Sequence, residues 1–267
     1  MDNQNFLCLV SCFKNESMII KEWLNHYKNE GVNHFFLIDN GSTDNYIDEI
    51  NDNLDMITLI KDDTRLKVKG TQNYLINKHF NNDTCCKKYK WTIVCDIDEY
   101  IYARNSYKTI PDYLEKVSDA VFQIWLPWKI FGDNNNKTQP DCILNNFYRR
   151  GNLKKGNQNY HFGLGKSICK SKYINALAVH KCSTNKPVHD SKGIQLNGEY
   201  NFDFKLDNLH INHYMFMSEQ YYKDVKCIRG GGQQNGYCGK YSMEFFYKNC
   251  DKNNLVEDYE LKNKTYN

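Results

Sequence analysis

The stretch Trp91-Thr-Ile-Val-Cys-Asp-Ile-Asp-Glu-Tyr100 joins a short apolar run to three carboxylates within four residues. The run Trp91–Cys95 has the length and the β-branched and aromatic content of a buried strand. Asp96, Asp98 and Glu99 repel one another, and a chain gains nothing structurally by placing them at the mouth of such a strand. The stretch therefore predicts a buried strand that ends at an acidic, ligand-binding edge of a sheet.

Strand and helix signals alternate through the first hundred residues. Continuous apolar runs alternate with segments whose apolar residues recur at helical spacing, and Gly31 stands where a glycine would end the first helix. The alternation predicts a parallel sheet with helices on both faces, whose ligands bind beyond the carboxyl ends of the strands. The predicted strands are Phe6–Cys12, Val32–Ile38, Met56–Ile60 and Trp91–Cys95, and the predicted helices are Ser17–Glu30, Tyr46–Asn53 and Thr71–His79.

The second half of the sequence is less regular. Its predicted elements are short strands, a polar loop and one helix, and neither a repeat nor a linker divides the chain. We therefore predict a single α/β domain over residues 1–267, with a mixed sheet in its C-terminal part. The predicted strands are Ala120–Trp128, Lys166–Cys169, Ala176–His180 and His210–Phe216, the loop is Asp133–Asn136, and the helix runs from Ser218 to about Cys227.

The acidic group after the fourth strand has the pattern of a metal site. Alternate residues of a strand point the same way, so Asp96 and Asp98 can face one ligand while Ile97 packs. Mg²⁺ and Mn²⁺ take carboxylate oxygens and fill their remaining positions with water and substrate phosphates. The alternative is that these acids begin a helix, where the helix dipole favours negative charge.

Two further polar groups accompany predicted strands. The turn Asp39-Asn-Gly-Ser-Thr-Asp44 could bind a base or a ribose, or it could simply cap the next helix. His210 and His213 are three positions apart in one predicted strand, so they point to opposite faces and only one can face a donor. A lone histidine is more often a hydrogen-bonded core group than a ligand. The sequence holds neither GxGxxG nor GxxxxGK[ST], the fingerprints of dinucleotide and P-loop sites.

Composition narrows the class of protein. The net charge is +3, charged residues of both signs are interspersed, and the apolar and aromatic fractions of 40% and 14% support a packed core. This charge distribution does not indicate nucleic-acid binding, and the small excess of positive charge suits a phosphate-bearing substrate. No apolar run reaches eighteen residues and no signal-peptide pattern is present, so we expect no membrane span and a cytoplasmic location. The abundant Asn and Lys suggest an AT-rich genome, viral or bacterial.

The eleven cysteines include no CxxC pair, so neither a disulfide framework nor a tetrathiolate zinc site is predicted. Most are expected to be reduced core thiols.

Short motifs follow one another along the chain in a specific order and spacing. They resemble glycosyltransferase family 92 and the related family-2-like transferases over roughly residues 6–260. The loop Asn134–Gln139 and the stretch His189–Lys205 match nothing in this pattern. The motifs are Cys12-Phe-Lys-Asn-Glu16, Glu22-Trp-Leu-Asn-His26, Gly31-Val-Asn-His-Phe35, Asp39-Asn-Gly-Ser-Thr-Asp44, Gln72-Asn-Tyr74, Trp91 to Tyr100, Trp128-Lys-Ile-Phe-Gly132, Lys166-Ser-Ile-Cys169, Val179-His180, His213-Tyr214, and Lys226 with Arg229-Gly230.

The resemblance implies a Rossmann-like GT-A fold with one Mn²⁺ or Mg²⁺ between the acidic motif and the diphosphate of a UDP-sugar. Asp98 would be the firmest metal ligand, Asp96 would contact ribose or a metal-bound water, and His213 would complete the coordination. Residues 1–100 would form the nucleotide-binding half and residues 101–267 the acceptor-binding half. The other donor-binding residues would be Asp39 at the uracil, Ser11, Phe13 and Glu16 near the nucleoside, Lys69 and Gln72 beside the donor, and Lys226 and Arg229 at the pyrophosphate.

The reaction implied is transfer of a hexose, of galactose or glucose type, to a hydroxyl of a glycan or glycoconjugate, with inversion. An inverting enzyme needs a base that takes the proton of the acceptor hydroxyl. Asp190 and Asp133 are the two candidates for this base. Trp125, Trp128 and Tyr160 could stack on an acceptor sugar, although Trp125 could instead be a core residue. Lys226 and Arg229 could alternatively belong to a solvated helix face.

Two other classes of function remain open. One is a catalytically inactive GT-A-fold protein that binds sugar, although the intact Asp96, Asp98 and His213 argue against it. The other is a metal-dependent nucleotidyltransferase or hydrolase, because these enzymes also hold Mg²⁺ with carboxylates. The lack of a glycine-rich phosphate loop after Phe6–Cys12 disfavours the nucleotidyltransferase.

Overall fold

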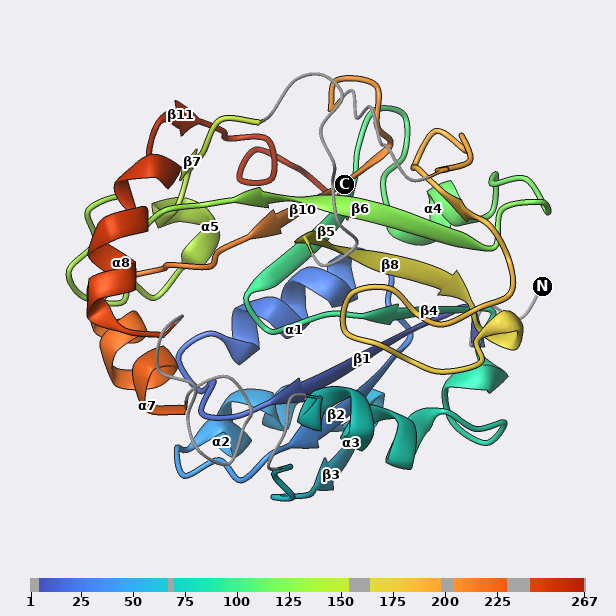
Figure 1. The fold of residues 1–267 in the computed structure, drawn as a ribbon, viewed down its shortest axis with the longest axis horizontal. Helices are drawn as coiled ribbons and strands as arrows, with labels where there is room; N and C mark the ends of the chain where they lie inside the picture. The colour runs from blue at the N-terminus through green and yellow to red at the C-terminus, as the bar shows by residue number, and fades with distance from the viewer. Residues whose placement is uncertain (1–4, 67–69, 154–163, 198–203, 230–240, 267) are drawn as a thin grey trace.

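The computed structural model describes residues 5–66, 70–153, 164–197, 204–229 and 241–266, which form one α/β domain with a mixed sheet (Figure 1). The predicted fold class is therefore confirmed. Within these residues, nine strands join in one sheet, and two short strands form a separate pair. The sheet strands are β1 (Leu7–Phe13), β2 (His34–Asp39), β3 (Ile57–Lys61), β4 (Trp91–Val94), β5 (Glu99–Ala103), β6 (Gln123–Ile130), β8 (Gly165–Lys170), β9 (Val188–His189) and β10 (Leu209–His213), and the separate pair is β7 (Arg149–Arg150) with β11 (Val256–Glu257).

The sheet changes from parallel to mixed along its width. Its order is β3-β2-β1-β4-β8-β6-β10-β5, with β9 beside β6. The first four of these strands are parallel, as predicted. Strand β8 is antiparallel to both of its neighbours, and β5 at the far edge is antiparallel to β10. Strand β5 follows β4 in the chain yet lies four strands away from it, so the acidic motif between them spans two parts of the sheet.

Helices cover both faces of the parallel part because successive strand residues point to opposite sides. On β1, Leu7 and Leu9 belong to the main core, whereas Cys8 and Val10 belong to a second core on the opposite face. Burial on both faces explains the continuous apolar runs from which these strands were predicted. The helices are α1 (Ile20–Asn29), α2 (Tyr46–Ile50), α3 (Thr71–Phe80), α4 (Ile110–Leu114), α5 (Ile143–Asn146), α6 (Glu219–Tyr221), α7 (Cys227–Arg229) and α8 (Met243–Asn249).

Helix α1 ends in the glycine cap that the sequence predicts. Gly31 has a φ of +87°. The N–H groups of Gly31 and Val32 donate to the carbonyls of Lys28 and Tyr27 at 3.1 and 2.9 Å, which is the Schellman pattern. A Cβ atom on Gly31 would lie 2.9 Å from the ring of Pro111 in α4. Both the backbone conformation and the close packing therefore require glycine here.

Two predictions for individual strands were wrong. Residues Ala176–His180 do not form a strand, because the only pairing there is an isolated bridge from Ala176 to Ser183, and the rest is loop. Strand β5 was not predicted, although Glu99 and the four residues after it are all buried. Carboxylates rarely begin a buried strand, and here the partner that covers Glu99 lies far along the chain.

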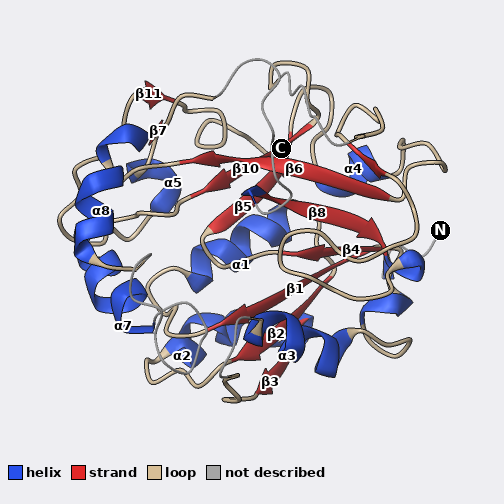
Figure 2. Ribbon diagram, in the orientation of Figure 1, coloured by secondary structure: helices blue, strands red, loops and turns tan. Residues whose placement is uncertain are grey.

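The helical segment after Ser218 is less regular than the predicted single helix. The Ser218 hydroxyl caps α6 by accepting from the N–H of Tyr221 at 3.0 Å. A π turn over Tyr222–Lys226 then joins α6 to α7. Figure 2 labels α7, the last part of this helical segment. Turns of this kind inside helices are rare and occur often at functional sites. Lys226, whose role is described below, lies at the end of this turn.

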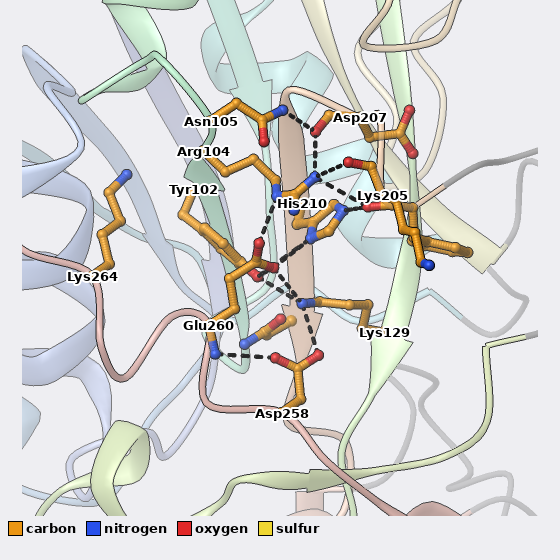
Figure 3. Close-up of polar contacts among 12 residues, drawn as sticks. Tyr102, Arg104, Asn105, Lys129, Lys205, Asp207, His210, Asp258, Glu260 and Lys264 are labelled. Atoms are coloured by element: carbon orange, nitrogen blue, oxygen red, sulfur yellow. Dashed lines mark hydrogen bonds and ion pairs between the residues drawn. The ribbon is translucent and has the colours of Figure 1, made fainter.

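The C-terminal segment is fixed to the sheet by a buried network of charges (Figure 3). The Glu260 carboxylate accepts from the Tyr102 hydroxyl at 2.6 Å and from His210 Nδ1 at 2.7 Å, and it pairs with Arg104. Lys129 Nζ lies 3.1 Å from Asp258 and 3.2 Å from Glu260. Burial lowers the pKa of Lys129, and the two carboxylates oppose this shift. The network therefore joins β5, β6 and β10 to the last residues of the chain.

Within the described residues, no helix has both the length and the apolar character that crossing a bilayer requires. Seven of the ten described cysteines are buried and none of the ten forms a disulfide, in agreement with the prediction of reduced core thiols.

Candidate functional site

A cleft lies at the carboxyl ends of β1, β2 and β4, where the sequence predicts ligand binding. Strand β1 leads into it at Phe13, β2 leads into it at Asn40, and β4 is followed by the acidic motif. The predicted site residues that line it are Phe13, Glu16, Gln72, Asp96, Asp98, His213, Lys226 and Arg229, and they are joined by Lys14, Arg65, Trp128 and His180, to which the sequence analysis gave no donor-binding or metal role.

Helix α1 positions the acidic motif through its buried aromatic side chains. Trp23 Nε1 donates to the backbone carbonyls of Asp96 and Glu99, at 3.1 Å in each case. The Tyr27 hydroxyl donates to the Glu99 carbonyl at 3.0 Å and accepts from the N–H of Ile101 at 2.9 Å. The loop between β4 and β5 is thus held by its backbone, which leaves its carboxylates to face other groups.

A buried lysine from β8 neutralises two of the three acids. Lys166 Nζ lies 2.7 Å from Asp96 and 3.1 Å from Glu99. Burial alone would lower the pKa of Lys166, but Asp96 and Glu99 outweigh burial and raise it. Glu99 is fully buried, and its Oε2 also accepts from the N–H of Asp96 at 2.9 Å. Glu99 therefore acts inside the protein, whereas Asp96, whose side chain is 33% exposed, reaches the cleft.

The third acid meets a histidine and a lysine from distant parts of the chain. Asp98 Oδ2 lies 3.5 Å from His213 Nε2 and 2.6 Å from Lys226 Nζ. Strand pairing brings the first two together, since Glu99 is opposite His213 and the N–H of Tyr214 donates to the Asp98 carbonyl at 2.8 Å. Burial would raise the pKa of Asp98, but Lys226 and His213 outweigh it and lower the pKa.

His210 faces away from the cleft. Its ring contacts Glu260 at 2.7 Å through Nδ1 and the Phe204 carbonyl at 2.8 Å through Nε2 (Figure 3). His210 and His213 therefore point to opposite faces of β10, as their spacing predicts, and His213 is the one that lies in the cleft.

The donor atoms at Asp98 fit one hard divalent cation when substrate oxygens complete the coordination. A carboxylate and an imidazole converge there, and His213 Nδ1 is buried without a hydrogen-bond partner among the described residues. Asp96, the other predicted ligand, is engaged by Lys166 and by Gln72, whose amide donates to it at 3.3 Å. The described residues contain no group of three His, Cys, Asp or Glu side chains arranged around one point. Mg²⁺ often takes only one or two protein ligands and fills its other positions with water and phosphate.

Several basic side chains lie close together in the lining of the cleft. Arg229 forms an ion pair with Glu16 and donates to the carbonyl of Lys14 at 3.3 Å. Arg65 reaches the Arg229 carbonyl at 3.4 Å. Burial and the neighbouring Arg65 both lower the pKa of Lys14, which shows that positive charge is crowded here. Such a group of cations favours an anionic ligand.

The other predicted donor-binding residues lie beside the cleft or outside the description. Asp39 is buried at the end of β2, where one oxygen accepts from the N–H of Ser42 at 2.7 Å and the other from the Tyr46 hydroxyl at 2.9 Å. These two bonds hold the turn that follows β2, while the next residue, Asn40, lines the cleft. Ser11 is fully buried in β1, one residue before the lining begins. Lys69 lies outside the described residues.

The two predicted catalytic bases are not among the described residues that line the cleft. Asp190 accepts from the N–H groups of Lys192 and Ile194, at 2.9 Å each, and its other oxygen lies 3.0 Å from Lys192 Nζ. Asp133 accepts from the amide of Asn254 at 2.7 Å. Both carboxylates thus stabilise loops around them, and their role as bases stays a prediction.

The structure adds residues for which the sequence gave no role, among them Lys166, Arg65 and His180. Lys166 comes from a strand antiparallel to β4, Arg65 follows β3, and His180 lies in the loop after β8. Lys166 and His180 belong to motifs that the family resemblance contains, which was the only signal for them. Arg65 belongs to no motif, and only the folded chain brings it to the cleft.

Comparison with solved structures finds S. aureus TarS. The structures of its residues 1–349, alone and in complex with UDP, are 15% identical to this chain with a TM-score of 0.40, and the match covers 63% of this chain and 48% and 47% of theirs. A third structure of S. aureus TarS matches with the same identity, TM-score and share of this chain, over 29% of its own length. The chain thus spans about half the length, or less, of these structures.

Comparison with curated proteins finds no match. The model of glycosyltransferase family 92 matches residues 5–266, almost the whole sequence. This match extends over both parts of the sheet and includes every segment that forms the cleft. The chain belongs to glycosyltransferase family 92.

Proposed function

We propose that this chain transfers a hexose of galactose or glucose type from a UDP-sugar to a hydroxyl of a glycan or glycoconjugate, with inversion and with the help of Mn²⁺ or Mg²⁺. The observation that carries the proposal is the convergence of Asp98 and His213 at 3.5 Å inside a cleft that basic residues also line. These two residues are far apart in the sequence, and the pairing of β5 with β10 serves to bring them together.

We assign the residues of the cleft to two parts of the donor, its diphosphate and its nucleoside. Arg65, Arg229 and Lys14 offer positive charge to the diphosphate, and Asn40 and Phe13 lie where β1 and β2 would meet the nucleoside. Lys226 holds Asp98 at 2.6 Å and lines the same cleft, so it can exchange this carboxylate for a phosphate oxygen when the donor arrives. Asp39 would contact the base through lone pairs not used by Ser42 and Tyr46.

Asp98 and His213 would hold the cation, and Asp96 would contact it through water. The bound cation would supply charge neutralisation for the departing nucleotide diphosphate. The protein's own part is to fix the carboxylate and the imidazole by strand pairing, and to keep Asp96 in place through Lys166.

The experiment is to incubate the purified chain with a panel of nucleotide sugars and Mn²⁺ and to measure release of the nucleotide diphosphate, with and without glycan acceptors. We expect release from UDP-hexoses, loss of release with EDTA, and recovery on adding Mn²⁺ or Mg²⁺. Asp98→Asn should be inactive, and Lys137→Met, which changes a side chain far from the lining, should keep full activity.

The outcomes separate the competing functions. Binding of UDP without release from any nucleotide sugar would support an inactive sugar-binding protein. Release of pyrophosphate from a nucleoside triphosphate would support a nucleotidyltransferase. Undiminished turnover in metal-free buffer would remove the cation from the proposal and leave Lys14, Arg65, Lys226 and Arg229 as the countercharges of the diphosphate among the described residues.

A further inference from the structure

Transfer to a hydroxyl needs a proton acceptor in the cleft, and every described carboxylate that lines the cleft has a cationic partner. Asp96 is paired with Lys166, Asp98 with Lys226, and Glu16 with Arg229. An ion pair keeps a carboxylate ionised but makes it a weak base, because the partner cation disfavours proton uptake. The cleft also contains His180, which the function proposed above does not use.

We propose that His180 is the catalytic base, and that its Nε2 takes the proton of the acceptor hydroxyl. This inference rests on the proposed glycosyltransferase activity and names a residue for it. The neutral imidazole is the only common side chain whose ordinary pKa lets it accept a proton near neutral pH without being perturbed.

The hydrogen bond of Nδ1, the other ring nitrogen of His180, shows that Nε2 is the basic nitrogen. His180 Nδ1 lies 3.2 Å from the carbonyl oxygen of Gly165. A carbonyl oxygen can only accept a hydrogen bond, so Nδ1 carries the hydrogen. In the neutral ring the lone pair is then on Nε2. An orienting bond of this kind on the far nitrogen is the usual arrangement for a histidine that acts as a base.

Gly165, whose carbonyl accepts from His180 Nδ1, has a fixed position in the sheet and can therefore orient the imidazole ring. It begins β8 and pairs with Pro127 in β6. A Cβ atom at Gly165 would lie 2.1 Å from the carbonyl oxygen of Leu126, so no side chain fits there. Lys166, which neutralises Asp96 and Glu99, is the next residue. The same strand thus fixes the acidic motif on one side and the proposed base on the other.

Trp128 contacts both histidines of the cleft. The centroid of its ring is 5.5 Å from that of His180 and 4.4 Å from that of His213. Flat indole faces are common platforms for sugars. An acceptor sugar packed on Trp128 would present its hydroxyls between the donor, bound near His213, and the imidazole of His180.

The proposed step balances as a single displacement. The acceptor oxygen forms a bond to the anomeric carbon while the bond from this carbon to the diphosphate oxygen breaks, and the diphosphate leaves with the electron pair. The hydroxyl proton moves to His180 Nε2, which becomes an imidazolium. The imidazolium later gives this proton to water, so the protein returns to its starting state.

The test compares His180→Ala and His180→Asn with the unchanged chain, using Mn²⁺, the UDP-hexose that the panel identifies and its acceptor. Both variants should lose about 100-fold or more in kcat, the usual contribution of general-base catalysis. The asparagine amide can still donate to the Gly165 carbonyl but cannot take a proton, so His180→Asn separates catalysis from folding. Affinity for UDP, measured by calorimetry, should change by less than about threefold in both variants.

Rescue by added imidazole gives a readout that a structural role would not produce. Imidazole should restore turnover of His180→Ala in proportion to its concentration, and should not restore His180→Asn, whose side chain fills the space. The matched control is His34→Ala, a half-buried histidine of β2 that bonds Thr58 and does not line the cleft. It should keep full kcat.

The experiment distinguishes a wrong assignment of His180 as the base from a wrong assignment of glycosyltransferase activity. If the unchanged chain releases no nucleotide diphosphate from any donor, the glycosyltransferase proposal fails first. If the unchanged chain transfers sugar and His180→Asn, correctly folded, does so at a similar kcat, His180 is not the base. Loss of kcat without imidazole rescue, together with weakened UDP binding, would likewise assign His180 to donor positioning and overturn the proposal.

Discussion

Two histidines of β10 are separated by only two residues, yet they belong to different environments. His213 lies 3.5 Å from Asp98 in the cleft, whereas His210 bonds Glu260 and the Phe204 carbonyl in the C-terminal network. Successive side chains of a strand point to opposite faces, so residues 210 and 213 must lie on different sides of the sheet. This arrangement also makes the pair a direct test of which face of the strand serves catalysis.

We predict that His213→Ala lowers metal-dependent turnover by at least about 100-fold, because a lost ligand removes several kcal/mol of charge stabilisation. Its melting temperature should change little. His210→Ala should show the opposite result, with turnover nearly kept and stability lowered by about 1–3 kcal/mol, since Glu260 and the Phe204 carbonyl lose a buried donor. Kinetics and urea unfolding of both variants measure this. The reverse assignment would mean that the cleft is not the active site.

Single residues also show where sequence reasoning reaches its limit. Asp98 and His213 could be proposed together only through the family resemblance, because nothing in their spacing brings residues so far apart into contact. Lys166 and Lys226 could not be assigned as partners of Asp96 and Asp98. Lysines are common surface residues, and only strand pairing and the π turn show that these two are buried.

At the scale of the helices and strands, the cap of α1 requires a glycine at position 31 for two separate reasons. Gly31 has φ +87° and would place a Cβ atom 2.9 Å from Pro111, whereas Gly193 has φ +83° and no atom within 4 Å. We predict that Gly193→Ala costs about 1–2 kcal/mol through its backbone alone. Gly31→Ala should cost about 1–3 kcal/mol more, because overpacking is added.

Chemical unfolding of the two glycine variants checks this prediction. Equal losses of stability would mean that α4 moves away from the new methyl group without cost. The comparison tests the contact between α1 and α4, since the two glycines have nearly the same φ.

The elements of the parallel half were predictable because their strands are buried on both faces and therefore appear as unbroken apolar runs. Leu7, Cys8, Leu9 and Val10 are all fully buried, so no polar residue interrupts this run. Strand β5 escaped prediction because it begins with Glu99, whose burial depends on Lys166. The apparent strand Ala176–His180 is a loop, because its apolar residues pack individually and lack a neighbouring strand.

In the whole molecule, the last residues of the chain return to the end of α1. The buried Glu30 carboxylate accepts from the N–H of Ala103 at 3.1 Å and from the Tyr266 hydroxyl at 3.0 Å, and it pairs with Lys264. Burial raises the pKa of Glu30 to about 7, although Lys264 and these donors lower it. The folded protein therefore binds a proton at this position that the unfolded chain releases near pH 4.5.

A defined dependence of stability on pH follows from Glu30. Its contribution should be fully present below about pH 4.5 and lost as pH rises through about 7, at a cost of up to about 3 kcal/mol. Urea unfolding across this interval should show a falling stability in the unchanged chain and a flatter curve in Glu30→Gln. Parallel curves for the two proteins would show that Lys264 keeps Glu30 ionised throughout.

The charge network of Figure 3 should be the most sensitive point of the fold outside the cleft. Lys129→Met removes the buried cation that Asp258 and Glu260 share and leaves them only Arg150 and Arg104 as cationic partners, which should cost up to about 3 kcal/mol. Adding Glu260→Gln should recover part of this loss, because it removes one of the two negative charges that Lys129 neutralises. Lys137→Met, at an exposed ion pair, should leave stability nearly unchanged.

The position of β10 also governs when during synthesis this protein can mature. Strand β10 lies between β6 and β5, and it is the last strand of the large sheet to leave the ribosome. Until it arrives, β5 has no partner, so its hydrogen-bonding edge remains open for as long as the ribosome needs to add about a hundred residues. Closing so long a loop is slow. The nascent chain should therefore depend on chaperones in this interval, and it should acquire its cleft only after β10 has been synthesised.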